Sequence, residues 1–280
     1  MASGSGTGRV TAPGVALCGL LLILIAASIW LFTSDQYWFT ALASVHGAAV
    51  DQLFVILLIT TGVAFIVIQG LLGYFVVRYG SDGENRASHW HENAKVEVIL
   101  IGITALTLTV LVFMGQRVWA DIYFSEPPED ALLIEVTGQQ FQWVVRYPGP
   151  DGLFGQLDVS LVSDSNFIGL DRSDPAGTDD IMTLNQVHIV VDQPVRFLLR
   201  SSDVIHNFNL PNFRVKQDAV PGMTIESWFI PTETGEFEIA CAELCGLGHY
   251  RMKGALFVDE TEAELQQFLQ DQLPFQSADD

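Results

Sequence analysis

The segment C-A-E-L-C-G-L-G-H-Y-R-M, residues 241–252, brings two thiols, an imidazole and a thioether together within a short stretch of chain. Thiolate and thioether sulfur together favour copper, and a long, weak bond to methionine is typical of copper electron-transfer sites. Two cysteines four residues apart can bridge a pair of copper ions, and each ion then needs one terminal imidazole and one weak ligand. His206 and His249 can supply the imidazoles, and Met252 can supply one weak ligand. The segment therefore predicts a binuclear copper site.

Two other uses of these residues remain open. An extracytoplasmic domain lies in an oxidising environment, so Cys241 and Cys245 can form a disulfide. The two cysteines can also join two histidines in a tetrahedral zinc site. Neither use gives a role to Met252, and a disulfide gives none to either histidine. Cys18 lies in an apolar segment, where we expect it to pack without reacting.

Taken with S-S-D-V-I-H at residues 201–206, the cysteine segment resembles subunit II of the haem–copper cytochrome c oxidases. In that family these positions hold the binuclear copper centre called CuA. The resemblance implies that Cys241 and Cys245 bridge the two copper ions and that His206 and His249 are their terminal imidazole ligands. It also implies that the Met252 thioether and the backbone carbonyl of Glu243 are the two weak ligands.

The resemblance also implies a place in electron transport. A subunit of this kind accepts electrons from a c-type cytochrome and passes them to haem in subunit I, where oxygen is reduced to water and protons are translocated. No catalytic residue is therefore expected in this chain itself. The side chain of Glu243 would face subunit I and help to hold a magnesium ion. The alternative is the electron-accepting subunit of a CuA-type nitric oxide reductase, and a copper-delivery protein is a third hypothesis.

An aromatic segment is the candidate for electron uptake. Residues 138–143, G-Q-Q-F-Q-W, occupy the place of the family's G-x-Q-W-x-W segment, whose first tryptophan is taken to receive the electron. Phe141 stands at that position here. Trp143 lies two residues further on and would point to the same face of a strand. The resemblance makes Phe141 or Trp143 the candidate, and ordinary strand packing is the alternative for both.

Two carboxylates are candidates by position. Asp203 stands where the family presents acid toward cytochrome c, and a solvated turn is the alternative. Glu97 stands where the family places a carboxylate at the mouth of a proton-uptake channel into subunit I. The tryptophan of the family's L-E-x-x-W pattern is absent here, because residues 96–100 read V-E-V-I-L. A carboxylate at a helix N-terminus is also favoured by the helix dipole alone.

Apolar runs near residues 15–32, 53–77 and 97–117 predict two to three transmembrane helices in an anchor that spans residues 1–118. Each run is about long enough to cross roughly 30 Å of hydrocarbon. The first run could be a cleaved signal peptide, but its length favours a retained helix. Basic residues in the 78–96 loop place that loop in the cytoplasm and the C-terminal region outside. The sequence thus predicts a multi-pass, lipid-embedded protein of a bacterial-type inner membrane with a periplasmic C-terminal domain.

Residues 119–280 predict an all-β domain. Short segments rich in β-branched and aromatic residues are separated by Gly/Pro turns, which argues for a sandwich or barrel. The expected strands are 132–138, 141–147, 182–191, 195–200, 224–230, 236–241 and 255–258. Thr261 and Glu264 fit a capping box that would start a C-terminal helix near 261–271. The family resemblance implies that this domain is a cupredoxin-like Greek-key barrel.

The chain is strongly acidic, with 33 Asp and Glu against 13 Lys and Arg and a net charge of −20. Most of the excess lies after residue 119, in the predicted outer domain. Its sign excludes nucleic acid as a partner. Such a field would steer a basic protein toward this domain in a salt-dependent manner, although simple solubility is the alternative explanation.

Overall fold

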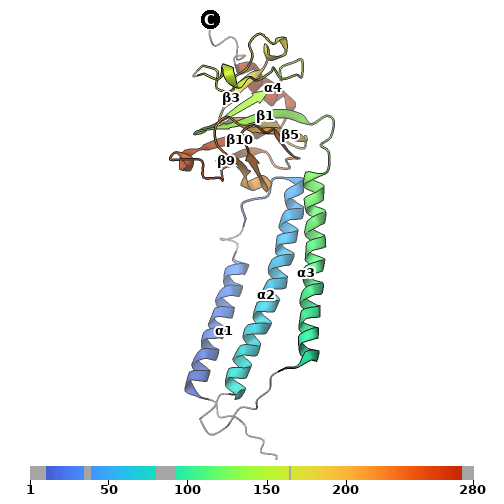
Figure 1. Ribbon diagram of the computed structural model, residues 1–280, viewed down its shortest axis with the longest axis vertical. Helices are drawn as coiled ribbons and strands as arrows, with labels where there is room; N and C mark the ends of the chain where they lie inside the picture. The colour runs from blue at the N-terminus through green and yellow to red at the C-terminus, as the bar shows by residue number, and fades with distance from the viewer. Residues whose placement is uncertain (1–10, 35–38, 80–91, 164, 273–280) are drawn as a thin grey trace, which may run out of the picture. The chain divides into compact units, whose positions relative to one another are not determined.

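The computed structural model describes residues 11–34, 39–79, 92–163 and 165–272 (Figure 1). Over these residues the chain divides into two compact units. One unit contains most of the long N-terminal helices. The other contains the C-terminal β-rich part together with Thr40–Asp51. This segment, which the sequence assigned to the membrane anchor, therefore belongs with the β unit.

Three helices in the described residues are long and apolar enough to cross a membrane. They are α1 (Ala12–Thr33), α2 (Val45–Tyr79) and α3 (Ala94–Tyr123), labelled in Figure 1. Almost none of the residues in their most apolar windows is buried within the protein, as expected for surfaces that face lipid. This confirms the predicted α-helical anchor. At 35 residues, α2 is about 50 Å long, more than hydrocarbon thickness requires.

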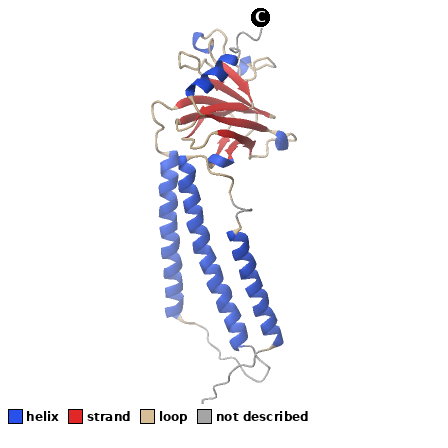
Figure 2. Cartoon of the chain, turned by 180° about the vertical axis from the view of Figure 1, so that it is seen from behind, coloured by secondary structure: helices blue, strands red, loops and turns tan. Residues whose placement is uncertain are grey.

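The β unit contains two five-stranded sheets within the described residues, coloured red in Figure 2. The first has the order β3-β2-β1-β5-β8, and the second has the order β4-β10-β9-β6-β7. Neighbouring strands are antiparallel except for the pairs β1–β5 and β4–β10. The strands are β1 (Leu132–Gln139), β2 (Gln142–Tyr147), β3 (Ile181–Leu184), β4 (Gln186–Val190), β5 (Val195–Ser201), β6 (His206–Leu210), β7 (Val215–Ala219), β8 (Ile225–Phe229), β9 (Gly235–Cys241) and β10 (Lys253–Asp259).

The core lies between the two sheets, where alternate residues of each strand meet. Ile134, Val136 and Phe197 from one sheet and Phe208 and Ile239 from the other are completely buried. Each such side chain contributes roughly 1.5–3 kcal/mol of hydrophobic stabilisation. The C-terminal helix α4 (Glu262–Asp271) packs beside β4 and β10, and its capping box is formed as predicted. The architecture confirms the expected all-β, cupredoxin-like barrel.

Two strands were not expected from the sequence. β6 has the sequence HNFNL, whose asparagines obscure the alternation that buries Phe208 and Leu210. β7 is polar on its exposed face and short. The single strand expected at 182–191 is instead split at Asn185, which adopts a positive φ of 58°. The Asn185 side chain accepts a hydrogen bond from the backbone N–H of Trp143, so the break also ties β2 in place.

The long connection between β2 and β3 is fixed to the barrel by a buried ion cluster. Arg146 donates to Glu135 and to Asp180, each at 2.8 Å, and to the carbonyl oxygen of Gly155 at 2.9 Å. Burial raises the pKa of Asp180, although Arg146 opposes this shift. Buried charges are tolerated when they are paired and hydrogen-bonded, as these are. A small apolar cluster around Leu170 completes the attachment.

Thr40–Asp51 joins the β unit through specific contacts. Ala43 and Ser44 are almost completely buried, each with 1% of its surface exposed. The Ser44 hydroxyl donates to the Phe213 carbonyl at 2.7 Å and accepts from the Gly47 N–H at 3.1 Å. Arg214 makes a bidentate ion pair with Asp51, with both distances 2.8 Å. The start of α2 is therefore part of the barrel's structure.

We expect Ser44→Ala to lower the free energy of unfolding of the β unit by about 1–2 kcal/mol, because it removes a helix cap and leaves a buried carbonyl without its donor. Chemical denaturation of the full-length protein in detergent, followed by near-ultraviolet circular dichroism, measures the change. Ser125→Ala is the control, since Ser125 is exposed and its backbone carbonyl, which accepts from Trp228, is retained. Equal stability of the two variants would contradict the structural role of Ser44.

Candidate metal centre

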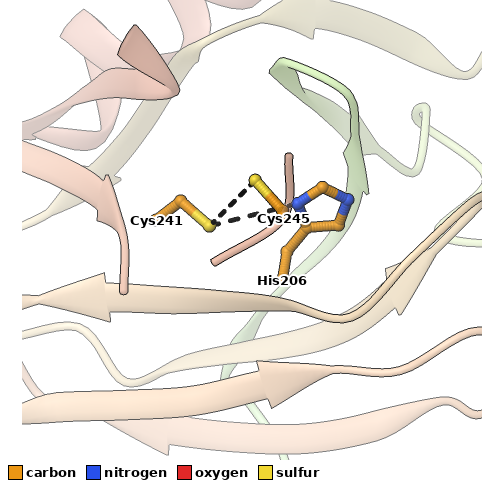
Figure 3. A group of neighbouring side chains, drawn as sticks. All are labelled: His206, Cys241 and Cys245. Carbon is orange, nitrogen blue, oxygen red and sulfur yellow. Dashed lines mark hydrogen bonds between the residues drawn. The ribbon is translucent and has the colours of Figure 1, made fainter. Parts of the chain in front are cut away.

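Pairing between β6 and β9 brings distant parts of the sequence together. The two strands are antiparallel, with Phe208 opposite Cys241. His206 is the first residue of β6, and Cys241 is the last residue of β9. The backbone N–H of Ala242 then bonds to the Asn207 carbonyl at 3.1 Å, which extends the pairing into the cysteine segment. This register places the His206 side chain beside the two cysteines (Figure 3).

His206, Cys241 and Cys245 form a compact cluster. Their ligand atoms all lie within 4.8 Å of one another, and no other such group of His, Cys, Asp or Glu occurs among the described residues. The two Sγ atoms are 3.8 Å apart, and Cys241 Sγ is 4.0 Å from His206 Nδ1. Ligand atoms bonded tetrahedrally to one metal at about 2.3 Å would be about 3.8 Å apart. The spacing therefore suits metal coordination.

The remaining predicted ligands surround this cluster. His249 Nδ1 lies 3.6 Å from Cys245 Sγ, and Met252 Sδ lies 3.8 Å from the same sulfur. The one-turn 3-10 helix η5 (His249–Arg251) carries His249 and is followed directly by Met252. The carbonyl oxygen of Glu243 is 3.2 Å from Cys241 Sγ. All six predicted donors thus converge on the thiol pair.

The site is shielded from water. His206 is completely buried, Met252 is 1% exposed and Cys245 is 4% exposed. Burial, together with the neighbouring Cys241 thiol, raises the pKa of Cys245 to about 11. Metal binding must therefore displace a proton, as it does whenever a thiolate is the ligand. Soft donors in an enclosed, water-poor pocket fit copper better than a hard, oxygen-seeking cation.

Asp203 lies against the cluster and faces inward. Its Oδ1 atom is 2.7 Å from His206 Nε2, and its side chain is only 27% exposed. Burial opposes ionisation of this carboxyl group, but hydrogen bonds from His206, Gln140 and Val204 lower its pKa overall. The sequence placed Asp203 on a docking surface for cytochrome c. The structure gives it a contact with a candidate ligand, and its docking role stays a prediction.

The two candidate aromatic residues have different surroundings. Trp143 is completely buried, and its ring packs edge-on to those of His206 and Phe208. A protein docked on the surface cannot touch it in this conformation. Phe141 is half-buried and lies against the cysteine segment, with the guanidinium of Arg251 5.7 Å from its ring centroid. Of the two, Phe141 alone reaches the surface, and electron uptake through it stays a prediction.

The other predicted site residues are exposed. Glu243 is exposed to solvent, so it is accessible to a partner. Glu97 lies in the first turn of α3 and accepts a 3.4 Å hydrogen bond from the backbone N–H of Asn93. A carboxylate in the first turn of a helix is also favoured by the helix dipole, so its position does not decide between the two explanations. Its role in proton uptake is therefore untouched by the structure and stays a prediction.

Three residues near the site were missed by sequence reasoning. Gly138 packs on the His206 ring, because a Cβ there would lie 2.7 Å from a ring carbon. A Cβ on Gly248 would lie 2.4 Å from the ring of Phe141. The amide of Gln140 donates to the carbonyl of Cys245 at 2.5 Å. A glycine within or beside a motif can indicate that another group packs directly on the backbone at that position. Only the fold shows that these groups are the rings of His206 and Phe141.

Comparison with known proteins agrees with this geometry. Residues 132–257 match the family described as cytochrome C oxidase subunit II, periplasmic domain. The alternative cytochrome c oxidase subunit 2 of Bradyrhizobium diazoefficiens is 36% identical over 262 residues, which cover 93% of each chain. The chain belongs to the cytochrome c oxidase subunit II family. Its relatives are parts of haem–copper oxidases, which are oxidoreductase complexes, and the matched periplasmic domain is the C-terminal part of this chain.

More distant relatives extend the comparison. The probable cytochrome c oxidase subunit 2 of Rickettsia felis is 31% identical over 207 residues, covering 74% of this chain and 62% of the relative. Among solved structures, the periplasmic domain of subunit II of cytochrome oxidase (CoxB) of Bradyrhizobium japonicum is 32% identical. That match covers 51% of this chain and 94% of the solved chain, with a TM-score of 0.38.

We expect Gly248→Ala to weaken metal binding at least tenfold, because the added methyl group displaces Phe141 or the segment that carries His249. Competitive titration of the full-length protein with a copper chelator measures the affinity. The double variant Gly248→Ala/Phe141→Ala removes the ring and should recover most of the loss. If the double variant binds as weakly as Gly248→Ala alone, contact with Phe141 is not the reason that this position is glycine.

Proposed function

We propose that this chain accepts electrons from a c-type cytochrome at a binuclear CuA centre and passes them to haem in subunit I of a terminal oxidase. The ligands proposed are Cys241 and Cys245 as bridges, His206 and His249 as terminal imidazoles, and Met252 and the Glu243 carbonyl as weak ligands. Two thiolate-bridged copper ions would supply reversible one-electron transfer. Oxygen reduction and proton translocation would belong to the complex.

The observation that carries this proposal is the arrangement of imidazoles around the thiol pair. His206 approaches Cys241, whereas His249 approaches Cys245. His249 does not join the compact group formed by His206 and the two cysteines within the described residues. A single tetrahedral ion would need all four donors at about the same short separation. One imidazole at each end of a thiol pair instead favours two metal positions.

The protein's own contribution is rigidity and exclusion of water. His206 and Cys241 begin and end paired strands, so the backbone at both is fixed by sheet hydrogen bonds. Trp143 packs edge-on against the His206 ring, which is completely buried and so kept from water. A donor set that cannot rearrange changes little when an electron arrives or leaves. The energy needed to reorganise the site is then small, and electron transfer is fast.

The proposed partners follow from the chain's surfaces. The acidic β unit suits a basic c-type cytochrome, and Phe141 is the proposed point of electron uptake. The exposed Glu243 carboxylate is available to help hold magnesium at the contact with subunit I, and Glu97 is proposed for proton uptake. The helices would lie in lipid of a bacterial-type inner membrane, with the β unit in the periplasm. The relatives compared above are cytochrome c oxidase subunits, so they lend no support to the nitric oxide reductase alternative.

We expect the copper-loaded, full-length protein in detergent to bind two copper ions and to give a multi-line EPR spectrum. One unpaired electron shared by two equivalent coppers produces more hyperfine lines than the four of a single copper. Cys245→Ser should abolish this spectrum, because a hydroxyl group bridges metals far less well than a thiolate. Cys18→Ser is the control, since Cys18 is a thiol that lies in α1.

The full-length chain is needed because Thr40–Asp51 is part of the β unit. Metal content by elemental analysis accompanies each spectrum. Binding of one copper ion, or of zinc in preference to copper, would contradict the proposed centre. A native spectrum in Cys245→Ser would contradict the assignment of the bridging ligands.

We expect reduction of the centre by a basic cytochrome c to slow at least tenfold as the salt concentration rises from about 10 to 200 mM. Over that range the reach of exposed charges shrinks from about 30 Å to under about 10 Å, so electrostatic steering is lost. Stopped-flow absorbance at limiting cytochrome measures the rate. A small uncharged reductant is the control and should show little dependence on salt. A rate with cytochrome that is equally insensitive to salt would exclude steering by the acidic domain.

A further inference from the structure

Asp203 joins two segments that lie far apart in the sequence. Its carboxylate accepts hydrogen bonds from His206 Nε2 at 2.7 Å, from the backbone N–H of Val204 at 2.6 Å and from the backbone N–H of Gln140 at 2.7 Å. Oδ1 receives the first two bonds and Oδ2 receives the third. Both oxygens are therefore engaged in holding the protein's own groups, which is not what a free docking charge requires.

Gln140 continues the connection to the cysteine segment. Its side-chain amide donates to the Cys245 carbonyl at 2.5 Å and lies close over Gly246. A Cβ on Gly246 would be 2.7 Å from the Gln140 amide nitrogen, and Gly246 also has a φ of 135°, which residues with a side chain rarely adopt. Glycine at this position allows the turn that contains Gln140 to sit directly on the cysteine segment.

We propose that Asp203 and Gln140 form a bracket, defined by these two side chains, that holds the two halves of the ligand set in register. One half is His206 on β6, and the other is the cysteine segment after β9. This inference rests on the proposed function only for the identity of the metal, because the bracket is built entirely from protein contacts. Asp203 and Gln140 are positioning residues in this scheme, since neither offers an atom to the thiol cluster.

The bracket has a direct chemical effect on His206. A hydrogen bond from Nε2 to Asp203 fixes the proton on that nitrogen, so Nδ1 presents its lone pair toward Cys241. Ring orientation and tautomer are thereby set before a metal arrives. The hydrogen bond from Gln140 to the Cys245 carbonyl fixes the backbone of the cysteine segment, and with it the position of the Cys245 sulfur. The site is consequently preorganised in the metal-free protein.

Hydrogen–deuterium exchange of the metal-free, full-length protein tests the Gln140 arm. Gln140→Ala should speed exchange of the protected amides in residues 241–252 about fivefold, the effect of losing one hydrogen bond of ordinary strength. Gln139→Ala is the matched control, because the Gln139 side chain bonds to Gln142 and not to the cysteine segment. Equal exchange in the two variants, or faster exchange spread evenly over the whole barrel, would overturn the role of Gln140.

Nitrogen-15 NMR of the His206 ring in the metal-free protein tests the Asp203 arm. Alanine offers no acceptor at this position, so Asp203→Ala should lose all three bonds and populate both imidazole tautomers of His206. Glu226→Gln is the matched control, because it removes the same charge from an exposed ion pair with Arg196. A single, unchanged tautomer in Asp203→Ala would overturn the role of Asp203.

Copper loading separates this inference from the proposed function. With copper bound, Asp203→Ala should change the hyperfine splittings of the EPR spectrum, while Glu226→Gln should leave them as in the native protein. If the native protein binds a single copper ion, the proposed function fails, yet the two metal-free measurements still test the bracket. If the native spectrum is binuclear and Asp203→Ala leaves both that spectrum and the His206 tautomer unchanged, the bracket fails alone.

Discussion

The short antiparallel pairing of β6 with β9 is the constraint on which the site depends. It joins Phe208 to Cys241 and Asn209 to Ala240, and it continues into the cysteine segment through Ala242. A shift of one residue would turn His206 to the opposite face of the sheet, because successive side chains of a strand alternate. The inward-facing Phe208, completely buried between the sheets, fixes this register. The hydrophobic core therefore positions the candidate metal ligands.

Most residues of the candidate site lie in turns next to this strand pair and not in the middle of strands. The β1–β2 turn, the segment before β6 and the cysteine segment meet at one end of the barrel and are joined by Asp203 and Gln140. Rigid strands hold the ends of each turn, so the turns combine exposure with precise placement. Such an arrangement is what a site needs when a partner must approach closely but water must stay away from the donors.

The acidic surface and the apolar helices serve a different need from the site. In the proposed function, the helices would hold the protein in the membrane and the acidic surface would attract a basic partner, over distances much longer than a hydrogen bond. The start of α2 is joined to the β unit, since Ser44 bonds to Phe213, the last residue of η4 (Pro211–Phe213), and Asp51 bonds to Arg214, which follows it. The β unit thus includes Thr40–Asp51, a segment separated in the chain from the rest of the unit by residues 52–116.

Sequence alone determined the three apolar helices, the barrel, the capped helix α4 and the six candidate ligands. These features depend on local properties, namely apolar length, alternation, capping residues and soft donors at short spacing. Tertiary structure decided that β6 exists, that Asp203 faces His206, that Trp143 is buried and that Thr40–Asp51 belongs to the β unit. Each of these depends on contacts between residues far apart in the chain. A local sequence pattern does not specify which distant residue will contact a given side chain. That contact is determined only when the chain folds.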